Sequence, residues 1–213
     1  MADPTANRRL DAGTTVAPHQ LTALSGDSVS IPDPGQLVHL QLRRFAGCPV
    51  CNLHLRSVVL RNDELNAAGI REVVVFHSST EDLRKYQAEL PFAVIPDPEK
   101  KLYAEFGVEA APRAILSPRA WPAIIRGLIR SIGATIRGRE HAPPVKPEGG
   151  SLGLPGDFLI ASDGHVVASK YGTHAYDQWT VDEVLALAKP ARGGGGSTAT
   201  TAPADQPQPS AYS

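Results

Sequence analysis

The hydrophobic pattern predicts strands and helices that alternate through the middle of the chain. Residues 37–42 form an apolar strand pattern, and residues 70–76 form a continuous valine-rich run typical of a buried parallel strand. Apolar residues at helical spacing follow these runs over 51–69 and 80–90, and a short strand pattern follows at 92–95. This order predicts an α/β domain with a mostly parallel sheet at its centre.

Hairpin patterns precede and follow these alternating elements. Two short apolar stretches between residues 16 and 31 flank the turn Ser25-Gly26-Asp27. Near the other end of the chain, 157–160 and 166–169 are joined by a turn containing Asp163-Gly164, which is a strong hairpin signal. We therefore expect a mixed sheet, in which antiparallel strands extend a parallel centre.

Composition and pattern together divide the 213 residues into three parts. Residues 1–13 are polar and are predicted to be flexible, and 14–190 are predicted to form one α/β domain. Residues 191–213 are rich in Gly, Ser, Thr, Ala and Pro, which predicts a disordered tail. Within the domain, a segment at about 117–150 interrupts the alternation of strands and helices, and we interpret it as a helical insertion.

The insertion contains a basic amphipathic segment, 121–139, with apolar residues at helical spacing. Such a helix can lie on a membrane surface, or it can dock a partner protein. The interpretation that we favour is a cover, which packs its apolar face on the domain and shields the cysteine site. The apolar positions are Trp121, Ile124, Ile125, Leu128, Ile129 and Ile132, and the arginines are Arg119, Arg126, Arg130, Arg137 and Arg139.

The chain has two cysteines, Cys48 and Cys51, at the junction between the strand pattern 37–42 and the following helix pattern. A Cys-x-x-Cys pair at a strand-to-helix junction of an α/β fold is a redox arrangement. The amide groups of the first helical turn stabilise a thiolate there, which can lower a thiol pKa from about 8.5 to roughly 3.5–7.5. Two buried structural thiols are the alternative.

Composition excludes several other classes of protein. The net charge of −1 gives no overall electrostatic basis for binding nucleic acid. Two cysteines are too few for a disulfide framework, and two thiols alone do not fill a zinc site, so we expect no metal and no cofactor. The start of the chain lacks a signal-peptide pattern, and no apolar run approaches the roughly 20 residues of a membrane span. We therefore expect a cytoplasmic protein with reduced thiols.

These features in this order resemble the peroxiredoxin branch of the thioredoxin superfamily, in particular the peroxiredoxin-like (AhpC/TSA-type) proteins that carry Cys-x-x-Cys. The resemblance covers roughly 14–190. It implies a thioredoxin-like α/β fold with a peroxiredoxin-type N-terminal hairpin and a central mixed sheet flanked by helices. The residues that carry it are Arg43-Arg44-Phe45-Ala46-Gly47-Cys48-Pro49-Val50-Cys51, Val74-Val75-Phe76-His77-Ser78, Ile95-Pro96-Asp97-Pro98, Tyr103-Ala104-Glu105-Phe106-Gly107-Val108, Gly156-Asp157-Phe158-Leu159-Ile160 and Asp163-Gly164.

The cysteine segment departs from the peroxiredoxin motif Pro-x-x-x-Thr-x-x-Cys. With Cys51 in the position of the peroxide-reactive cysteine, Cys48 takes the place of the threonine and Arg44 that of the proline. The set that activates peroxide in that family is therefore incomplete. Peroxiredoxin logic makes Cys51 the nucleophile, whereas thioredoxin logic makes Cys48 the more exposed, attacking thiol and Cys51 the resolving one. We favour Cys48.

Three arginines and one histidine near the cysteines are candidate supporting residues. Arg43, Arg44 or Arg56 would lower a thiol pKa if its side chain came close, and a solvent-exposed arginine is the alternative for each. His54 is a candidate proton carrier, although a surface histidine is the more common outcome at such a position.

The resemblance also implies a cis-proline against the cysteines. Pro155 is our first candidate and Pro112 the second, and Arg113 is a candidate for an arginine that reaches the site. His77 and His174 lie near strand ends without a recognisable partner, and we assign neither a catalytic role.

The function that we predict is a thiol-based oxidoreductase of antioxidant defence, which reduces peroxides or disulfides through a Cys48/Cys51 dithiol–disulfide cycle. Its partners would be an external thiol reductant and the peroxide or disulfide substrate, and reduction of a peroxide-bearing lipid is a further option. The alternative is a non-catalytic binding or regulatory protein that uses the basic helix 121–139. The sequence leaves the oligomeric state open, a homodimer included.

Overall fold

A computed structural model describes residues 9–87, 90–108, 121–136, 150 and 153–193. The elements in chain order are β1 (His19–Thr22), β2 (Ser28–Ile31), β3 (Leu37–Arg43), α1 (Pro49–Leu60), α2 (Asn62–Ala67), β4 (Ile70–Phe76), α3 (Thr80–Gln87), β5 (Ala93–Pro96), α4 (Lys101–Glu105), α6 (Trp121–Ile136), β6 (Gly156–Ile160), β7 (Val166–Tyr171) and α7 (Val181–Gly193).

The central sheet has five strands in the order β5-β4-β3-β6-β7. Strands β3, β4 and β5 run parallel, whereas β6 is antiparallel to β3 and β7 is antiparallel to β6. Strands β1 and β2 form a separate antiparallel hairpin, attached to the edge strand β5 by a hydrogen bond from the Leu24 N–H to the Val94 carbonyl. The mixed α/β sheet and the leading hairpin that the sequence predicts are both present.

The ends of the predicted domain differ slightly from the structure. The Gly13 N–H donates to the Val166 carbonyl at 2.8 Å, so the chain is already attached to β7 before residue 14. Helix α7 begins with a capping box, in which Thr180 and Glu183 bond each other's backbone N–H groups, and it continues to Gly193. The rest of the predicted tail, and most of the predicted flexible N-terminus, lie outside the described residues.

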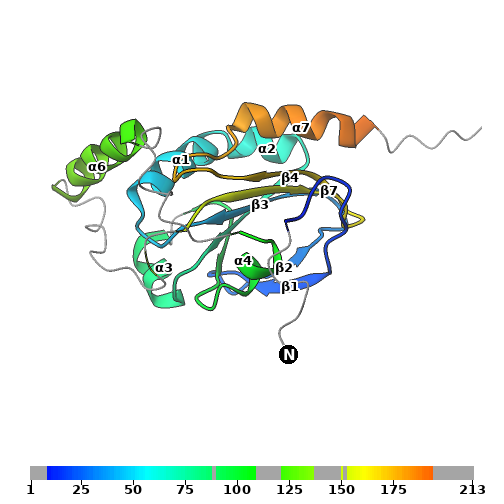
Figure 1. Cartoon of the computed structure of the whole chain (residues 1–213), viewed down its shortest axis with the longest axis horizontal. Helices are drawn as coiled ribbons and strands as arrows, with labels where there is room; N and C mark the ends of the chain where they lie inside the picture. Colours follow the sequence, from blue (N-terminus) through cyan, green and yellow to red (C-terminus); the bar gives the residue numbers. More distant parts are fainter. Residues whose placement is uncertain (1–8, 88–89, 109–120, 137–149, 151–152, 194–213) are drawn as a thin grey trace, which may run out of the picture.

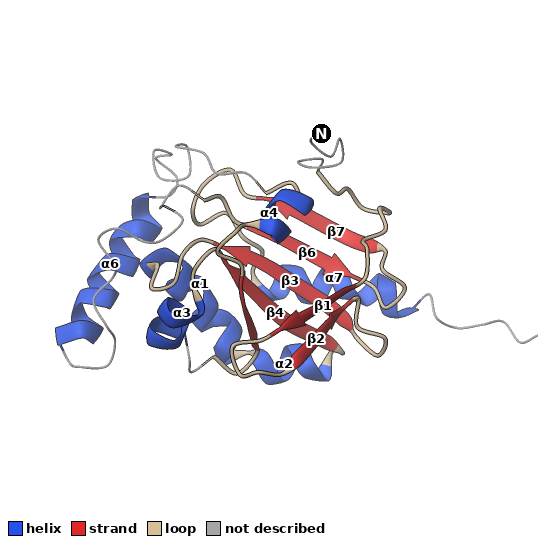
Figure 2. Ribbon diagram, turned by 90° about the horizontal axis from the view of Figure 1, so that it is seen from below, coloured by secondary structure: helices blue, strands red, loops and turns tan. Residues whose placement is uncertain are grey.

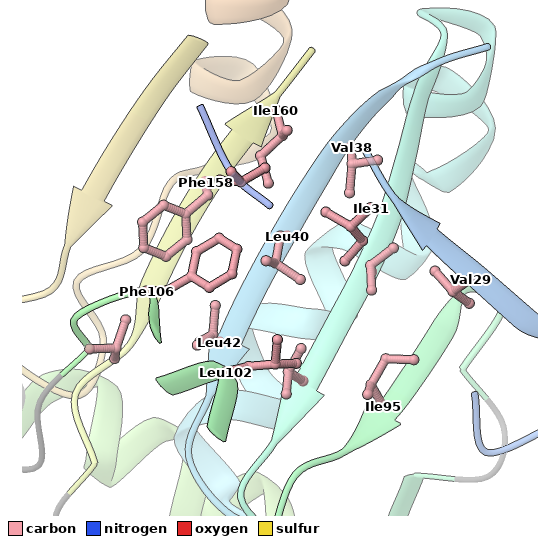
Figure 3. Packing of buried hydrophobic residues seen from close by; sticks show 14 of the residues in the cluster. Val29, Ile31, Val38, Leu40, Leu42, Ile95, Leu102, Phe106, Phe158 and Ile160 are labelled. Atoms are coloured by element: carbon pink, nitrogen blue, oxygen red, sulfur yellow. The ribbon is translucent and has the colours of Figure 1, made fainter. Parts of the chain in front are cut away.

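One face of the sheet carries the largest apolar core. Because side chains alternate along a strand, Val38, Leu40 and Leu42 of β3 all point to this face. They pack under the β1–β2 hairpin and α4, which lie on the same side of the sheet in Figure 1. Figure 3 shows Phe106 against Phe158 in this core, with ring centroids 5.0 Å apart in an edge-to-face arrangement.

The opposite face of the sheet packs against α1, α2 and α7. Its centre is polar, because the alternate residues of β3 on this side are His39, Gln41 and Arg43, and all three are buried. Apolar residues from the helices surround these side chains, including Val58 and Trp179. The sheet therefore has one apolar face and one face with a buried polar centre.

Helix α6 lies at the outside of the molecule beside α1 in both views (Figures 1 and 2). The two helices are in contact, and α6 reaches the N-terminal end of α1, where the cysteines are located. This helix falls within the predicted insertion, the remainder of which lies outside the described residues.

Candidate active site around the two cysteines

A tight loop after β3 places Cys48 at the start of helix α1. Gly47 has φ 75°, a conformation that glycine adopts without steric cost, and it turns the chain so that Cys48 becomes the N-cap residue. Pro49 follows at the first helical position, where its missing N–H costs nothing. The local sequence Gly-Cys-Pro therefore dictates a strand-to-helix junction with a sulfur at the helix tip.

The sulfur of Cys48 sits among hydrogen-bond donors. The backbone N–H of Cys51 donates to Cys48 Sγ at 3.4 Å, and the guanidinium Nη1 of Arg44 lies 3.6 Å from the same sulfur. Both cysteines are unpaired thiols, and both have an exposed fraction of 0%. A thiolate at Cys48 would thus be held by a helix N-terminus and one buried cation.

These contacts separate the pKa values of the two thiols. Burial by itself raises the pKa of Cys48, but the hydrogen bond from the Cys51 thiol, the charge of Arg44 and the N–H groups of Cys51 and Val50 lower it to about 6. Burial, the hydrogen bond with Cys48 and the charge of Cys48 raise the pKa of Cys51 well above its ordinary value. At neutral pH the pair therefore holds one thiolate, on Cys48, and one thiol, on Cys51.

The turn that follows β4 holds the cysteine loop in place through hydrogen bonds. The Ala46 N–H donates to Ser78 Oγ at 2.9 Å, and the His77 N–H donates to the Arg44 carbonyl at 3.2 Å. Tyr103 adds a third attachment, because its hydroxyl bonds the carbonyl groups of Arg43 and Val75. The ends of β3 and β4 are thus held together directly beneath the cysteines.

Comparison with protein families identifies the chain. A sequence model described as AhpC/TSA antioxidant enzyme matches residues 58–174, which is more than half of the chain. The chain belongs to the AhpC/TSA antioxidant enzyme family. The match begins after Cys51, so membership does not rest on the two cysteines.

Solved structures of a peroxidoxin, a peroxiredoxin and a protein assigned to thiol:disulfide interchange share the fold. Peroxidoxin BcpB from Mycobacterium tuberculosis has 16% identity and a TM-score of 0.60, covering 85% of this chain and 98% of its own. A cysteine-to-serine mutant of peroxiredoxin 6 from Arenicola marina has 14% identity and a TM-score of 0.61, covering 86% and 74%. A Chlorobium tepidum structure assigned as thiol:disulfide interchange protein DsbE has 20% identity and a TM-score of 0.54, covering 84% and 99%. A search of curated protein sequences finds no significant match.

Among the predicted supporting residues of this AhpC/TSA protein, the structure brings Arg44 to the site. Arg43 points to the opposite side of the loop, where its guanidinium bonds Gln41 and, at 2.6 Å, Asp157. Arg56 is exposed on α1 and is not among the groups that shift the pKa of either cysteine. The expectation that Cys48 is more exposed than Cys51 is wrong, because both side chains have an exposed fraction of 0%.

The predicted cis-proline at Pro155 is also wrong. Within the described residues, the cis bond is Ile31–Pro32, in the turn after β2, and the Leu154–Pro155 bond is not cis. Pro155 enters β6 in an extended conformation, and its carbonyl accepts a hydrogen bond from the Gly172 N–H at 2.9 Å. That pairing with the end of β7 already fixes the entry into the strand. Pro112 and Arg113 lie outside the described residues.

The histidines have roles that sequence reasoning did not find. His54 is buried, not on the surface, and its Nε2 lies 2.8 Å from the Trp179 carbonyl. Burial and the charge of Arg43 lower the pKa of His54 to about 4, so its ring is neutral at pH 7. His77 faces the site instead: a Cβ placed on Gly153 would lie 3.0 Å from His77 Nε2 and 3.6 Å from Arg44 Cγ.

Two residues near the cysteine loop, His77 and Ser78, could have been identified from the sequence. His77-Ser78 directly follows a buried parallel strand, and polar residues at the carboxyl end of such a strand face the same sheet edge as the cysteine loop. Gly153 had no such signal, because its importance is the close approach of two distant segments. The role of Tyr103 likewise depends on a contact 60 residues away in sequence.

Helix α6 lies over the start of α1, where the cysteines are located, which confirms the predicted position of the cover. The prediction that it packs on the domain with its apolar face is wrong. Ile124 of α6 packs in the cluster that contains Cys48 and Cys51, and Gly127 lies against the Pro49 carbonyl. Trp121, Ile125, Leu128, Ile129 and Ile132 of α6 are exposed. Taken together, the site holds a stabilised thiolate and a thiol one helical turn apart, under a helix that excludes water. Such an arrangement can carry out thiol–disulfide chemistry.

Proposed function

We propose that this AhpC/TSA-family protein is a thiol-dependent oxidoreductase in which Cys48 is the nucleophile and Cys51 the resolving thiol. The observation that supports this assignment is the environment of Cys48 Sγ, which receives the N–H of Cys51 and lies 3.6 Å from the Arg44 guanidinium. A pKa of about 6 makes most of Cys48 thiolate at pH 7.

The proposed cycle with a peroxide has two steps. The Cys48 thiolate attacks one oxygen of the peroxide, the O–O bond breaks, and the departing oxygen takes a proton and leaves as an alcohol or water, which leaves Cys48 as a sulfenic acid. The Cys51 sulfur then attacks the Cys48 sulfur, the S–O bond breaks, and the oxygen leaves as water. Two electrons from an external dithiol or from two thiols restore the pair.

The electrostatic interaction between the two thiols determines when the second step can begin. The charge on Cys48 is one of the causes that raise the pKa of Cys51. Once Cys48 is a neutral sulfenic acid, that charge is gone and Arg44 has no thiolate to neutralise. The pKa of Cys51 then falls, and the resolving thiolate forms after the first step and not before it.

The burial of both sulfurs favours a small substrate. With an exposed fraction of 0% for each cysteine, a protein disulfide cannot reach Cys48 unless α6 leaves α1, whereas a hydroperoxide needs only a narrow opening. We therefore propose peroxide reduction as the main activity and disulfide reduction as the second candidate, with an external thiol system as reductant. The two unpaired thiols fit a reducing compartment such as the cytoplasm.

Stopped-flow kinetics of the reduced protein with hydrogen peroxide and with insulin test this proposal. We expect oxidation by peroxide to be at least about tenfold faster than that of free cysteine at pH 7, because the lowered pKa enlarges the thiolate fraction. Cys51→Ser should accumulate a sulfenic acid on Cys48 that dimedone traps. Cys48→Ser should show neither reaction.

Two outcomes would contradict the assignment. A sulfenic acid in Cys48→Ser, but not in Cys51→Ser, would make Cys51 the nucleophile. Rates no faster than free cysteine with both substrates would favour the alternative function, a non-catalytic binding or regulatory protein that uses the basic helix α6. Preferential reaction with insulin would make disulfide reduction the main activity.

A further inference from the structure

Helix α6 packs on the domain with Gly127, Ser131 and Ile124, and five of its other large residues are exposed. A Cβ placed on Gly127 would lie 2.8 Å from the Pro49 carbonyl oxygen, so the close contact with α1 requires a glycine. Ser131, one turn further on, is also buried, and Ile124 reaches the cluster around the cysteines. These residues form the side of α6 that covers the start of α1.

The bulky apolar residues form a separate stripe on the same helix. Their spacing of i, i+4, i+7, i+8 and i+11 follows one side of an α-helix. About half or more of each side chain is accessible to solvent, although a helix on the outside of a soluble domain normally turns such residues inward. The stripe consists of Trp121 (56% exposed), Ile125 (50%), Leu128 (47%), Ile129 (66%) and Ile132 (48%).

Positive charge accompanies this stripe. Arg126 and Arg130 are exposed on α6 beside it. Between Ala110 and Arg139 the sequence contains six arginines and no lysine, aspartate or glutamate. Because the whole chain has a net charge of −1, the remainder is negative and the sequence segment that contains this helix is positive. An apolar stripe bordered by arginines is the pattern of helices that lie in the headgroup region of a bilayer.

We propose that the stripe of α6 docks on an anionic phospholipid surface, with its apolar residues among the upper acyl chains and its arginines at the phosphates. The helix lies in the plane of the interface, and none of the described helices is long and apolar enough to cross a membrane. Since the opposite side of α6 covers the start of α1, docking brings the Cys48 site to the bilayer surface.

Charge favours lipid over a second copy of the chain as the occupant of this stripe. In a two-fold dimer through α6, the arginine-rich segment of one copy would face the same segment of the other, and like charges would oppose the contact. Anionic headgroups supply the opposite charge along the whole length of the helix, about 24 Å for 16 residues.

Co-sedimentation of the full chain with phosphatidylcholine vesicles, with and without phosphatidylglycerol, tests the proposal. We expect binding to the anionic vesicles that salt weakens, and little binding to pure phosphatidylcholine. Brominated acyl chains should quench Trp121, whereas Trp179, which is 7% exposed, should stay unquenched. Binding does not require thiol chemistry, so Cys48→Ser should bind as wild type does whatever its activity.

Matched variants separate the two components of binding. Ile125→Gln/Ile129→Gln and Arg126→Gln/Arg130→Gln should each reduce the bound fraction at limiting lipid at least about tenfold. The controls are Leu60→Gln, an apolar residue that is 71% exposed on α1, and Arg84→Gln/Lys85→Gln on α3, and these should bind like wild type. Circular dichroism should show the same fold in all four.

Three results would overturn the proposal. The first is a wild-type protein that does not sediment with anionic vesicles, and the second is full retention of binding by either α6 double variant. The third is analytical ultracentrifugation showing a dimer that Ile125→Gln/Ile129→Gln dissociates, together with no vesicle binding, which would assign the stripe to a second copy of the chain.

Discussion

Arg43 and Arg44 are adjacent in sequence and both buried, but their charges are neutralised by different groups. Arg43 ends β3 and points to the polar centre of the sheet, where a carboxylate, Asp157, lies 2.6 Å away. Arg44 begins the loop, and its Nη1 lies 3.6 Å from the sulfur of Cys48. One arginine therefore belongs to a buried ion pair, whereas the other lies beside the thiol that we propose as the nucleophile.

Arg43 and Asp157 belong to a buried network that also contains His39 and Glu72. His39 Nδ1 lies 2.9 Å from Glu72 and its Nε2 lies 3.4 Å from Asp157, so the ring is held between two carboxylates. Burial lowers the pKa of His39, but the charges and hydrogen bonds of Glu72 and Asp157 raise it to about 9. Burial raises the pKa of Asp157, and Arg43 and His39 together lower it below its ordinary value. The network is charged but internally neutralised.

The charge that opposes each buried arginine is permanent for Arg43 but not for Arg44. Carboxylates remain ionised at neutral pH, so the Arg43 pair is permanent and contributes to a fixed fold. A thiolate is formed only if its pKa is lowered, and it disappears when the sulfur reacts. The charge of the Cys48 thiolate opposes that of Arg44 only in the reduced state, which links the charge balance of the loop to the redox state of Cys48.

The largest effect is expected from breaking the Arg43 pair. Asp157→Asn leaves the Arg43 charge buried without its carboxylate, and removal of one partner of a buried pair costs roughly 3–5 kcal/mol of stability. Urea unfolding of the reduced protein measures this loss. Arg43→Met/Asp157→Leu removes both charges and should recover much of it. A loss below about 1 kcal/mol in Asp157→Asn would mean that the pair is not structural.

The next largest effect is expected in the pH dependence of the free energy of unfolding, to which His39 and Cys48 should contribute with opposite sign. The pKa of His39 is raised from 6.5 to about 9, so its contribution is complete below pH 6.5 and is lost as the pH rises through 9. The pKa of Cys48 is lowered from 9.0 to about 6, so its contribution is complete above pH 9 and is lost as the pH falls through 6. Between pH 6.5 and 9 the two oppose each other, each by up to about 1.4 kcal/mol per pH unit.

Urea unfolding across this pH range tests the opposition. Wild type should change little, Cys48→Ser should lose stability as the pH rises, and His39→Gln should gain it. The slope with pH is the measured quantity, so a general destabilisation by His39→Gln does not obscure the result. Equal slopes in the two variants would contradict the assignment.

A smaller effect is expected from Arg44→Met. Loss of a charge close to the sulfur should raise the pKa of Cys48 by about 1–3 units, because an opposite charge at 4–6 Å has an effect of that size. The rate of iodoacetamide alkylation as a function of pH, measured in a Cys51→Ser background, reports this pKa. Arg56→Met is the matched control and should leave the curve in place. If both variants shift the curve equally, proximity of Arg44 is not the cause.

The smallest effect is expected from a surface arginine that also has carboxylate partners. Arg61 bonds Glu64 at 2.8 Å and Asp182 at 2.7 Å, but the three side chains are 36%, 50% and 79% exposed, respectively. Water and salt screen such pairs, so Arg61→Gln should leave the urea midpoint unchanged within error. A loss comparable with that of Asp157→Asn would show that burial is not what distinguishes Arg43.

Much of the fold could be predicted because its signals are local. The valine-rich run of β4, the Asp163-Gly164 turn and the capping box at Thr180 each depend on neighbouring residues, and each is present in the structure. The strand-to-helix placement of Cys48 and Cys51 is of the same kind, since Gly47 and Pro49 specify it. Burial of the sulfurs and of His54 was not predictable in this way, because it depends on which distant segments pack above α1.

By itself, the sequence determined the order of the elements, the redox pair at the helix tip and the candidate arginines. The tertiary structure decided between those arginines, because Arg43 at the end of β3 pairs with Asp157 of β6, whereas Arg44 in the loop reaches Cys48. It also decided which side of α6 is covered, since Gly127 permits the closest approach to α1 and leaves the larger residues outside. Patterns along a chain give the residues that can share a face, and only packing selects the face that is buried.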